Sequence, residues 1–123
     1  MEFSQPKGIF QQIADQMRDR ILDGEWSEGE RIPSIRDLAI SVGVNPNTVT
    51  KSYQALLDRR IIENQRGLGY FVAAEARKRI VDELKAEFVR NELPRVFRTM
   101  RVLGMNLDDL GPHFARLNGE NAS

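Results

Sequence analysis

The chain has 123 residues, of which 41% are hydrophobic and 29% charged, and its 18 basic and 18 acidic side chains give a formal net charge of zero. This length and composition fit one packed domain with a small appendage, and they exclude a membrane protein, because no apolar run approaches the ~20 residues of a membrane span. The absence of cysteine excludes a disulfide framework and a thiolate metal site, and the N-terminus lacks the basic-then-apolar pattern of a signal peptide, so we expect a cytoplasmic protein.

The first predicted element is a helix over residues 9–23. Its apolar residues recur at spacings of three and four, which is the period of one helix face: Phe10, Ile13, Met17 and Ile21. Gly24 is a natural helix stop. The turn-rich loop after it contains Trp26, which we interpret as a core residue rather than a ligand platform.

Two shorter helices around a tight turn follow. Ser34 precedes an apolar stripe and should be the N-cap of a helix over residues 34–42. Asn45 should cap a third helix over residues 46–58, where Pro46 fits the first position because its missing N–H costs nothing there. The inward face of the third helix is predicted to consist of Val49, Tyr53 and Leu56.

A two-stranded hairpin should complete this region. Residues 61–64 and 70–73 have the composition of strands, and the glycine-containing turn between them joins the two. Two helices around a turn, followed by a hairpin, are typical of a winged helix-turn-helix, which presents one helix to the major groove of DNA. The sequence therefore predicts a mainly α-helical fold with a small β-hairpin wing, whose N-terminal DNA-binding domain covers residues 1–73.

The remaining residues, 74–123, are predicted to form a short helical dimerisation region. Pro94 should break or kink its first helix, because the ring removes a hydrogen bond and clashes one turn back. Asn106 should cap a last helix, and the Gly111-Pro112 pair leaves its continuity open. The apolar rows exceed what a small domain can bury, so they imply a second copy of the chain. The predicted dimerisation residues are Ile80, Leu84, Phe88, Phe97, Met100, Leu103, Leu110 and Phe114.

The candidate DNA-contacting residues lie in the helix-turn-helix and the wing. A net charge of zero disfavours DNA binding, but residues 2–30 contain seven acidic and three basic residues, whereas residues 31–66 contain six basic and three acidic ones. Amides and hydroxyls at the start of the third helix can bond to base edges, and the basic side chains can bind phosphates. The predicted DNA-binding set is Arg31, Arg36, Asn45, Pro46, Asn47, Thr48, Thr50, Lys51, Arg66 and Gly67.

Each of these residues also has a purely structural interpretation. For Asn45, capping is favoured over DNA contact. For Asn47, Thr48 and Thr50, DNA contact is favoured, because nothing structural demands three polar residues there. A plain hairpin turn explains Gly67 as well as a close approach to DNA does.

Nothing in the sequence points to catalysis. His113 is the only histidine, so no histidine cluster can bind a metal. Asp108 and Asp109 are adjacent and cannot face each other on a helix. We therefore expect no catalytic residue, no metal site and no cofactor.

The motifs resemble the DNA-binding domain of GntR-type bacterial regulators. The run from Gly29 to Ala39 is similar to the start of that domain, and Gly67–Val72 matches its wing. The resemblance covers residues 9–73. Features that look specifically like the YtrA-like subfamily are Val44–Val49, Lys51 and Tyr53.

The resemblance implies particular residue roles. In the family, an arginine at the position of Arg36 and residues aligned with 45–50 contact DNA, and the glycine aligned with Gly67 approaches the minor groove. YtrA-like proteins also carry only a few C-terminal helices, which mediate dimerisation. Two positions depart from the family pattern: Arg60 stands where glycine is usual, and Leu68 replaces a basic or polar wing-tip residue.

Two functional interpretations follow. The first is a bacterial, homodimeric and sequence-specific transcriptional regulator, a repressor on an inverted-repeat operator in double-stranded DNA. The second is a protein-interaction module that has kept a winged helix but lost DNA binding, which the neutral net charge supports and the polar row at Asn47, Thr48 and Thr50 opposes. The sequence assigns no small-molecule effector.

Overall fold

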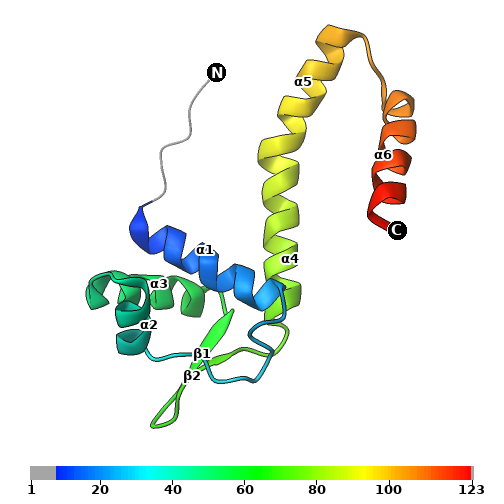
Figure 1. The fold of residues 1–123 in the computed structure, drawn as a ribbon. Coiled ribbons are helices and arrows are strands. Elements are labelled where there is room, and N and C mark those ends of the chain that lie inside the picture. Colours follow the sequence, from blue (N-terminus) through cyan, green and yellow to red (C-terminus); the bar gives the residue numbers. More distant parts are fainter. Residues whose placement is uncertain (1–7, 123) are drawn as a thin grey trace. The chain divides into compact units, whose positions relative to one another are not determined.

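The computed structural model describes residues 8–122, and of residues 120–122 it describes the backbone alone. It confirms a mainly helical chain with one antiparallel hairpin (Figure 1). Two compact units divide between Glu83 and Leu84, and we call them the first unit and the second unit. The elements are α1 (Ile9–Leu22), α2 (Ile35–Val42), α3 (Pro46–Asp58), β1 (Ile62–Gln65), β2 (Gly69–Val72), α4 (Ala76–Glu87), the π-helix η1 (Phe88–Glu92), α5 (Leu93–Leu103) and α6 (Leu107–Ala122).

The core of the first unit forms between α1 and α3. The buried face of α1 consists of Ile13, Ala14, Met17 and Ile21. The predicted inward face of α3 is confirmed, with one addition: Ser52 is also completely buried, and its hydroxyl donates to the carbonyl of Phe10 at 2.7 Å. Trp26 is a core residue as expected, with the Arg20 guanidinium 5.1 Å from its ring centroid.

Capping residues set the ends of α2 and the start of α3. The Ser34 hydroxyl accepts a hydrogen bond from the Asp37 N–H at 3.0 Å and so begins α2. Gly43 ends α2 in the left-handed conformation, with φ of 74°, which glycine adopts without strain. The Asn45 Oδ1 accepts from the Asn47 N–H at 2.7 Å, so the capping role of Asn45 is confirmed.

The hairpin is shifted by one residue from its predicted strands. β1 and β2 pair with Ile62 opposite Val72 and Gln65 opposite Gly69. Ile61 and Ala73 lie just outside the ladder, but both are buried and the Ala73 N–H still donates to the Ile61 carbonyl at 2.9 Å. On each strand the ladder of paired residues therefore lies one residue closer to the turn than the sequence predicts.

A third segment, which the sequence did not predict, runs along β2. The Ile32 N–H donates to the Tyr70 carbonyl at 2.9 Å, and the Val72 N–H donates to the Glu30 carbonyl at 2.9 Å. Arg31 forms an isolated bridge with Phe71. The segment before α2 is thus attached to the wing through its backbone.

Arg60 takes a glycine-like conformation after α3. Its φ is 61°, in the left-handed region that costs a side chain about 1 kcal/mol or more. The Arg79 guanidinium donates to the Arg60 carbonyl at 3.3 Å and to the Ala74 carbonyl at 2.8 Å. The turn after α3 therefore keeps the backbone shape that a glycine would give, at the position where the sequence departs from the family.

Pro94 does not break the helical run, because it stands in the first turn of α5 directly after a π-helical turn. η1 precedes it, and the Leu93 N–H bonds to the carbonyl of Phe88, five residues back. A π-helical turn shifts the hydrogen-bond ladder where proline cannot donate, so the chain passes directly from η1 into α5.

The last helix is continuous through Gly111 and Pro112. Asn106 caps it as expected, since its Oδ1 accepts from the Asp109 N–H at 3.1 Å while the Asp109 carboxylate accepts from the Asn106 N–H at 2.8 Å. This reciprocal pair is a capping arrangement that starts a helix firmly. None of the helices in the described range 8–122 has the length and apolar character that a membrane crossing requires.

The expectation that Ile80 contacts a second copy is wrong. Ile80 and Ala76 are completely buried, and both belong to the first unit. The first two turns of α4 therefore complete the core of the winged helix instead of extending a partner surface. This packing also explains why the first unit reaches Glu83, ten residues beyond the expected boundary at Ala73.

Tyr53 joins three parts of the first unit. Its hydroxyl donates to the Pro33 carbonyl at 2.5 Å, and its ring meets the Tyr70 ring edge-on with centroids 4.9 Å apart. Burial is the largest of the causes that raise the pKa of Tyr53 above its usual value. The hydroxyl thus stays protonated and remains a donor.

We expect Tyr53→Phe to lower the free energy of unfolding by about 0.5–1.5 kcal/mol at neutral pH, because it removes one hydrogen bond to a shielded carbonyl. Since the raised pKa belongs to the folded state, the wild-type advantage should shrink as the pH rises above about 10, where the unfolded tyrosine ionises first. Urea unfolding at pH 7 and pH 11 measures both. A gap between the two proteins that widens with pH would contradict this account of Tyr53.

Candidate nucleic-acid interface

The start of α3 presents a row of polar side chains to solvent. Asn47, Thr50 and Lys51 are exposed, and Thr48 is half-buried. The Thr50 hydroxyl donates to the Pro46 carbonyl at 3.0 Å, which orients it along the helix and leaves its oxygen able to accept. The opposite face of α3 is buried in the core, so an external ligand can reach this row.

Asn45 and Pro46 occupy the very beginning of α3, and both are exposed. The Asn45 Oδ1 accepts the capping hydrogen bond, which holds the side chain against the start of α3. The structure thus favours a structural role for Asn45, in line with the preference that the sequence indicated.

Basic side chains of the helix-turn-helix and wing lack acidic partners. Arg36, Lys51 and Arg66 are exposed, and between residues 8 and 122 no ion pair or hydrogen bond is described for any of the three. By contrast, Arg18 and Arg59 are paired with carboxylates. The net charge of zero therefore conceals a local excess of unneutralised positive charge in the predicted DNA-binding region.

The turn of the wing is an exposed loop with unusual backbone. The Leu68 N–H donates to the Gln65 carbonyl at 2.8 Å, and Gly67 has φ of 79°. Arg66, Gly67 and Leu68 are all exposed. The tip of the hairpin therefore offers a basic side chain and a glycine backbone side by side.

Gly69 has a role that sequence reasoning missed. A Cβ on Gly69 would lie 3.0 Å from the Nε of Arg31, closer than ordinary packing allows. Its absence leaves room for the Arg31 side chain against the wing. Only the pairing of residues 29–32 with β2 reveals this role of Gly69, because Arg31 and the hairpin are far apart in the sequence.

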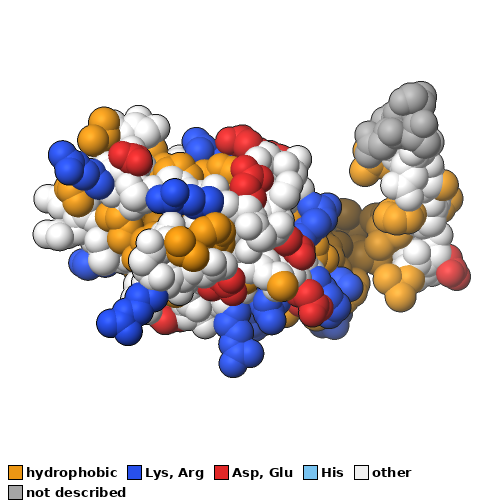
Figure 2. Space-filling view, turned by 90° about the horizontal axis from the view of Figure 1, so that it is seen from below, with side chains coloured by type: hydrophobic (Ala, Val, Ile, Leu, Met, Phe, Trp, Pro, Cys, Tyr) orange, Lys and Arg blue, Asp and Glu red, His pale blue; other side chains and the backbone are white. Residues whose placement is uncertain are grey.

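The surface seen from the hairpin end is mixed in charge. Figure 2 shows Lys and Arg side chains that project from several places on this face of the first unit, with hydrophobic and acidic groups between them. Such a surface suits a ligand that meets basic groups at a few defined points, as a duplex with regularly spaced phosphates does.

A helix-turn-helix with a β-hairpin wing and an exposed polar row on its second helix defines a winged-helix DNA-binding protein. The chain belongs to the gntR family of bacterial regulatory proteins, whose family model matches residues 9–72. This is a family of transcriptional regulators and not of enzymes.

Two curated relatives are similar to the chain over most of their own length. The chain is 38% identical over 109 residues to YhcF, an HTH-type transcriptional regulator of Bacillus subtilis, and the match covers 89% of this chain and 88% of YhcF. It is 34% identical over 102 residues to the HTH-type transcriptional repressor YtrA of the same organism, with 83% and 78% covered. A crystal structure of a GntR-family regulator from Bacteroides thetaiotaomicron superposes with a TM-score of 0.82 at 35% identity, with 93% of this chain and 99% of that chain covered.

Arg36→Ala should weaken DNA binding on every sequence. Loss of one phosphate contact should reduce the slope of log affinity against log salt by about 0.9. Thermal stability should be almost unchanged, because Arg36 is exposed and lies off the buried residues of α2. Fluorescence anisotropy at several salt concentrations measures the slope, with Arg95→Ala as a control in the second unit. An unchanged slope together with a lowered melting temperature would mean that Arg36 is structural.

Asn47→Ala should instead reduce discrimination between a selected DNA site and random DNA. A good base contact contributes roughly 1–3 kcal/mol of discrimination, whereas a phosphate contact contributes equally to both. The ratio of the two affinities is the measurement. Equal losses on both duplexes would limit Asn47 to the DNA backbone.

Proposed function

We propose that the chain is a homodimeric transcriptional repressor that binds an inverted-repeat operator in the cytoplasm. In this proposal α3 is the recognition helix, whose Asn47, Thr48 and Thr50 read base edges in the major groove. Asn45 and Pro46 hold the start of α3 at the groove. Phosphate contacts come from Arg31, Arg36, Lys51 and Arg66, and Gly67 lets the wing backbone approach the duplex.

The exposed hydrophobic surface of the second unit is the observation that carries the homodimer. Six of the residues expected there have exposed or half-exposed side chains: Leu84, Phe88, Phe97, Leu103, Leu110 and Phe114. Further exposed hydrophobic residues of this unit are Val89, Val96, Val102, Leu107 and Leu117. A monomer rarely exposes apolar side chains at this density, so a partner surface is the physical explanation.

A groove within the second unit adds to this surface. It measures about 490 Å³ and is lined in part by Phe97, Met100, Met105 and Leu107. Met100 lines the groove and is buried, and Leu110 is half-buried on α6. These two residues would meet a partner only at their edges, so we assign the larger share of the interface to Phe97, Leu103 and Phe114.

A second copy of the chain is the occupant we propose for this surface. Two-fold dimers are the commonest assemblies of identical chains, and a two-fold dimer of helix-turn-helix proteins matches an inverted repeat. The repressor role is supported by the similarity to YtrA, which is itself named a transcriptional repressor.

Selection from a pool of random-sequence duplexes tests the proposal. The full-length protein should enrich an inverted repeat, and addition of the protein should lower transcription from a promoter that contains it. Enrichment of no sequence would favour the alternative, a winged-helix interaction module without DNA binding. Enrichment of a single half-site would remove the homodimer but keep DNA recognition.

Leu103→Glu should turn the dimer into a monomer, since it places a charge on the exposed apolar surface. On the full operator we expect affinity to fall by a factor on the order of 10²–10⁴, the gain that joining two binding events provides, with little change on a single half-site. Sedimentation velocity and anisotropy measure the two effects. Ile9→Glu is the matched control, because Ile9 is a similarly exposed apolar residue in the first unit, 53% against 63%. A wild-type chain that stays monomeric at micromolar concentration would refute the dimer.

A further inference from the structure

We propose that the ion pair between Arg59 and Glu83 is a positioning pair for operator recognition. It fixes where α4 leaves the first unit, and it thereby sets the spacing between half-sites that the dimer accepts. This inference rests on the homodimer proposed above.

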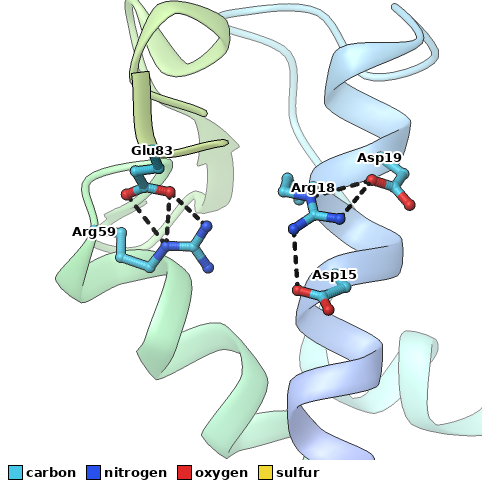
Figure 3. Close-up of polar contacts among 5 residues, drawn as sticks. All are labelled: Asp15, Arg18, Asp19, Arg59 and Glu83. Atoms are coloured by element: carbon cyan, nitrogen blue, oxygen red, sulfur yellow. Dashed lines mark hydrogen bonds and ion pairs between the residues drawn. The ribbon is translucent and has the colours of Figure 1, made fainter. Parts of the chain in front are cut away.

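The pair joins the end of the recognition helix to α4. Arg59 is the C-cap of α3, and its Nη2 donates to the Glu83 Oε1 at 2.6 Å, while its Nε lies 3.1 and 3.3 Å from the two carboxylate oxygens (Figure 3). An arginine that holds a carboxylate through two nitrogens restricts direction as well as distance. The two side chains are 31% and 38% exposed, so water screens the pair only partly.

The other ion pairs of the described chain are local. Arg18 pairs with Asp15 and Asp19 on its own helix, also drawn in Figure 3, and Lys78 pairs with Asp82 one turn along α4. Among the ion pairs described between residues 8 and 122, those other than Arg59–Glu83 join partners at most five positions apart. Such pairs support a helix but do not determine where α4 lies against α3.

Two arginines hold the other end of α4. Arg77 donates to the Leu22 carbonyl at the end of α1, and Arg79 donates to the carbonyls of Ala74 and Arg60. Carbonyl ends of helices and turns carry partial negative charge, so they attract guanidinium groups. The first turn of α4 is thus attached near the ends of both α1 and α3.

Glu83 is the point at which this attachment ends. Ala76, Ile80 and Glu83 fall on one face of α4 at spacings of four and three, and Ile80 is completely buried. The compact first unit ends at Glu83, while α4 continues to Glu87. A helix advances about 1.5 Å per residue, so a small tilt at Glu83 grows along every residue that follows.

The spacing of half-sites is a sensitive readout of that tilt. One additional base pair moves a half-site by about 3.4 Å along the duplex and rotates it around the duplex axis. A dimer in which the direction of α4 is fixed should therefore accept one spacing. Loss of the ion pair should loosen the direction of α4 without changing the residues of α3 that face DNA. A merely stabilising role would lower stability and would leave the spacing preference intact.

The experiment selects bound duplexes from a random-sequence pool with the full-length wild-type protein and with Glu83→Gln. Both should enrich the same half-site sequence. The wild type should enrich one spacing, whereas the variant should accept neighbouring spacings and bind the wild-type spacing roughly threefold to tenfold more weakly. Affinity for a single half-site and the melting temperature should stay close to wild type.

Three further variants complete the test. The double variant Arg59→Glu with Glu83→Arg should restore the single spacing, because it rebuilds the pair with reversed charge. Asp82→Asn breaks an exposed pair one residue away on the same helix and should change nothing. If Glu83→Gln fails to fold, Arg59→Lys keeps the charge but removes the two-pronged geometry, and it should broaden the spacing in the same way.

The two proposals fail in different ways. A Glu83→Gln protein that keeps the wild-type spacing, or loses equal affinity on half-site and full operator, overturns the positioning role and leaves the homodimer standing. A wild-type protein that enriches no paired half-sites overturns the homodimer itself.

Discussion

The buried inner face of α3 is the constraint on which the rest of the first unit depends. Val49 and Leu56 are completely buried, and Tyr53 between them bonds to the Pro33 carbonyl and packs edge-on against Tyr70. With that face committed to the core, the polar residues at the helix start can only face solvent. One side chain thus connects α3 to the segment before α2 and to the hairpin.

The wing follows from the same arrangement. Because residues 29–32 run along β2, the hairpin receives Arg31 from a distant part of the sequence, and Gly69 leaves the space in which that side chain lies. The balance of charge also depends on such placement. Carboxylates neutralise Arg18 and Arg59, while Arg36 and Arg66 have no acidic partner in the described part of the chain. A chain with zero net charge can therefore present, within residues 8–122, exposed Arg and Lys side chains (Figure 2) without carboxylate partners where DNA would bind.

α4 connects the packing of the first unit with the exposed surface of the second. Its early residues complete the winged-helix core, and the chain then continues through η1 into α5, where several apolar side chains are exposed. A π-helical turn lets the chain pass Pro94 without ending the helix. The link between DNA recognition and dimerisation in our proposal is thus a run of helix, and Glu83 is the place where it leaves the core.

The sequence by itself determined the features that depend on neighbours along the chain: the three helices of the winged domain, the caps at Ser34 and Asn45, the cap of α6 at Asn106, and the family. Caps and amphipathic periodicity are local, because a side chain two or three residues away satisfies a helix end. Tertiary structure alone decided which apolar rows are buried in a core and which are exposed. Ile80 and Phe97 look alike in the sequence, but one is completely buried and the other is exposed. Tertiary structure also decided the pairing of residues 29–32 with β2 and of Arg59 with Glu83. Such contacts join residues that are far apart in the chain, so they depend on how the helices pack.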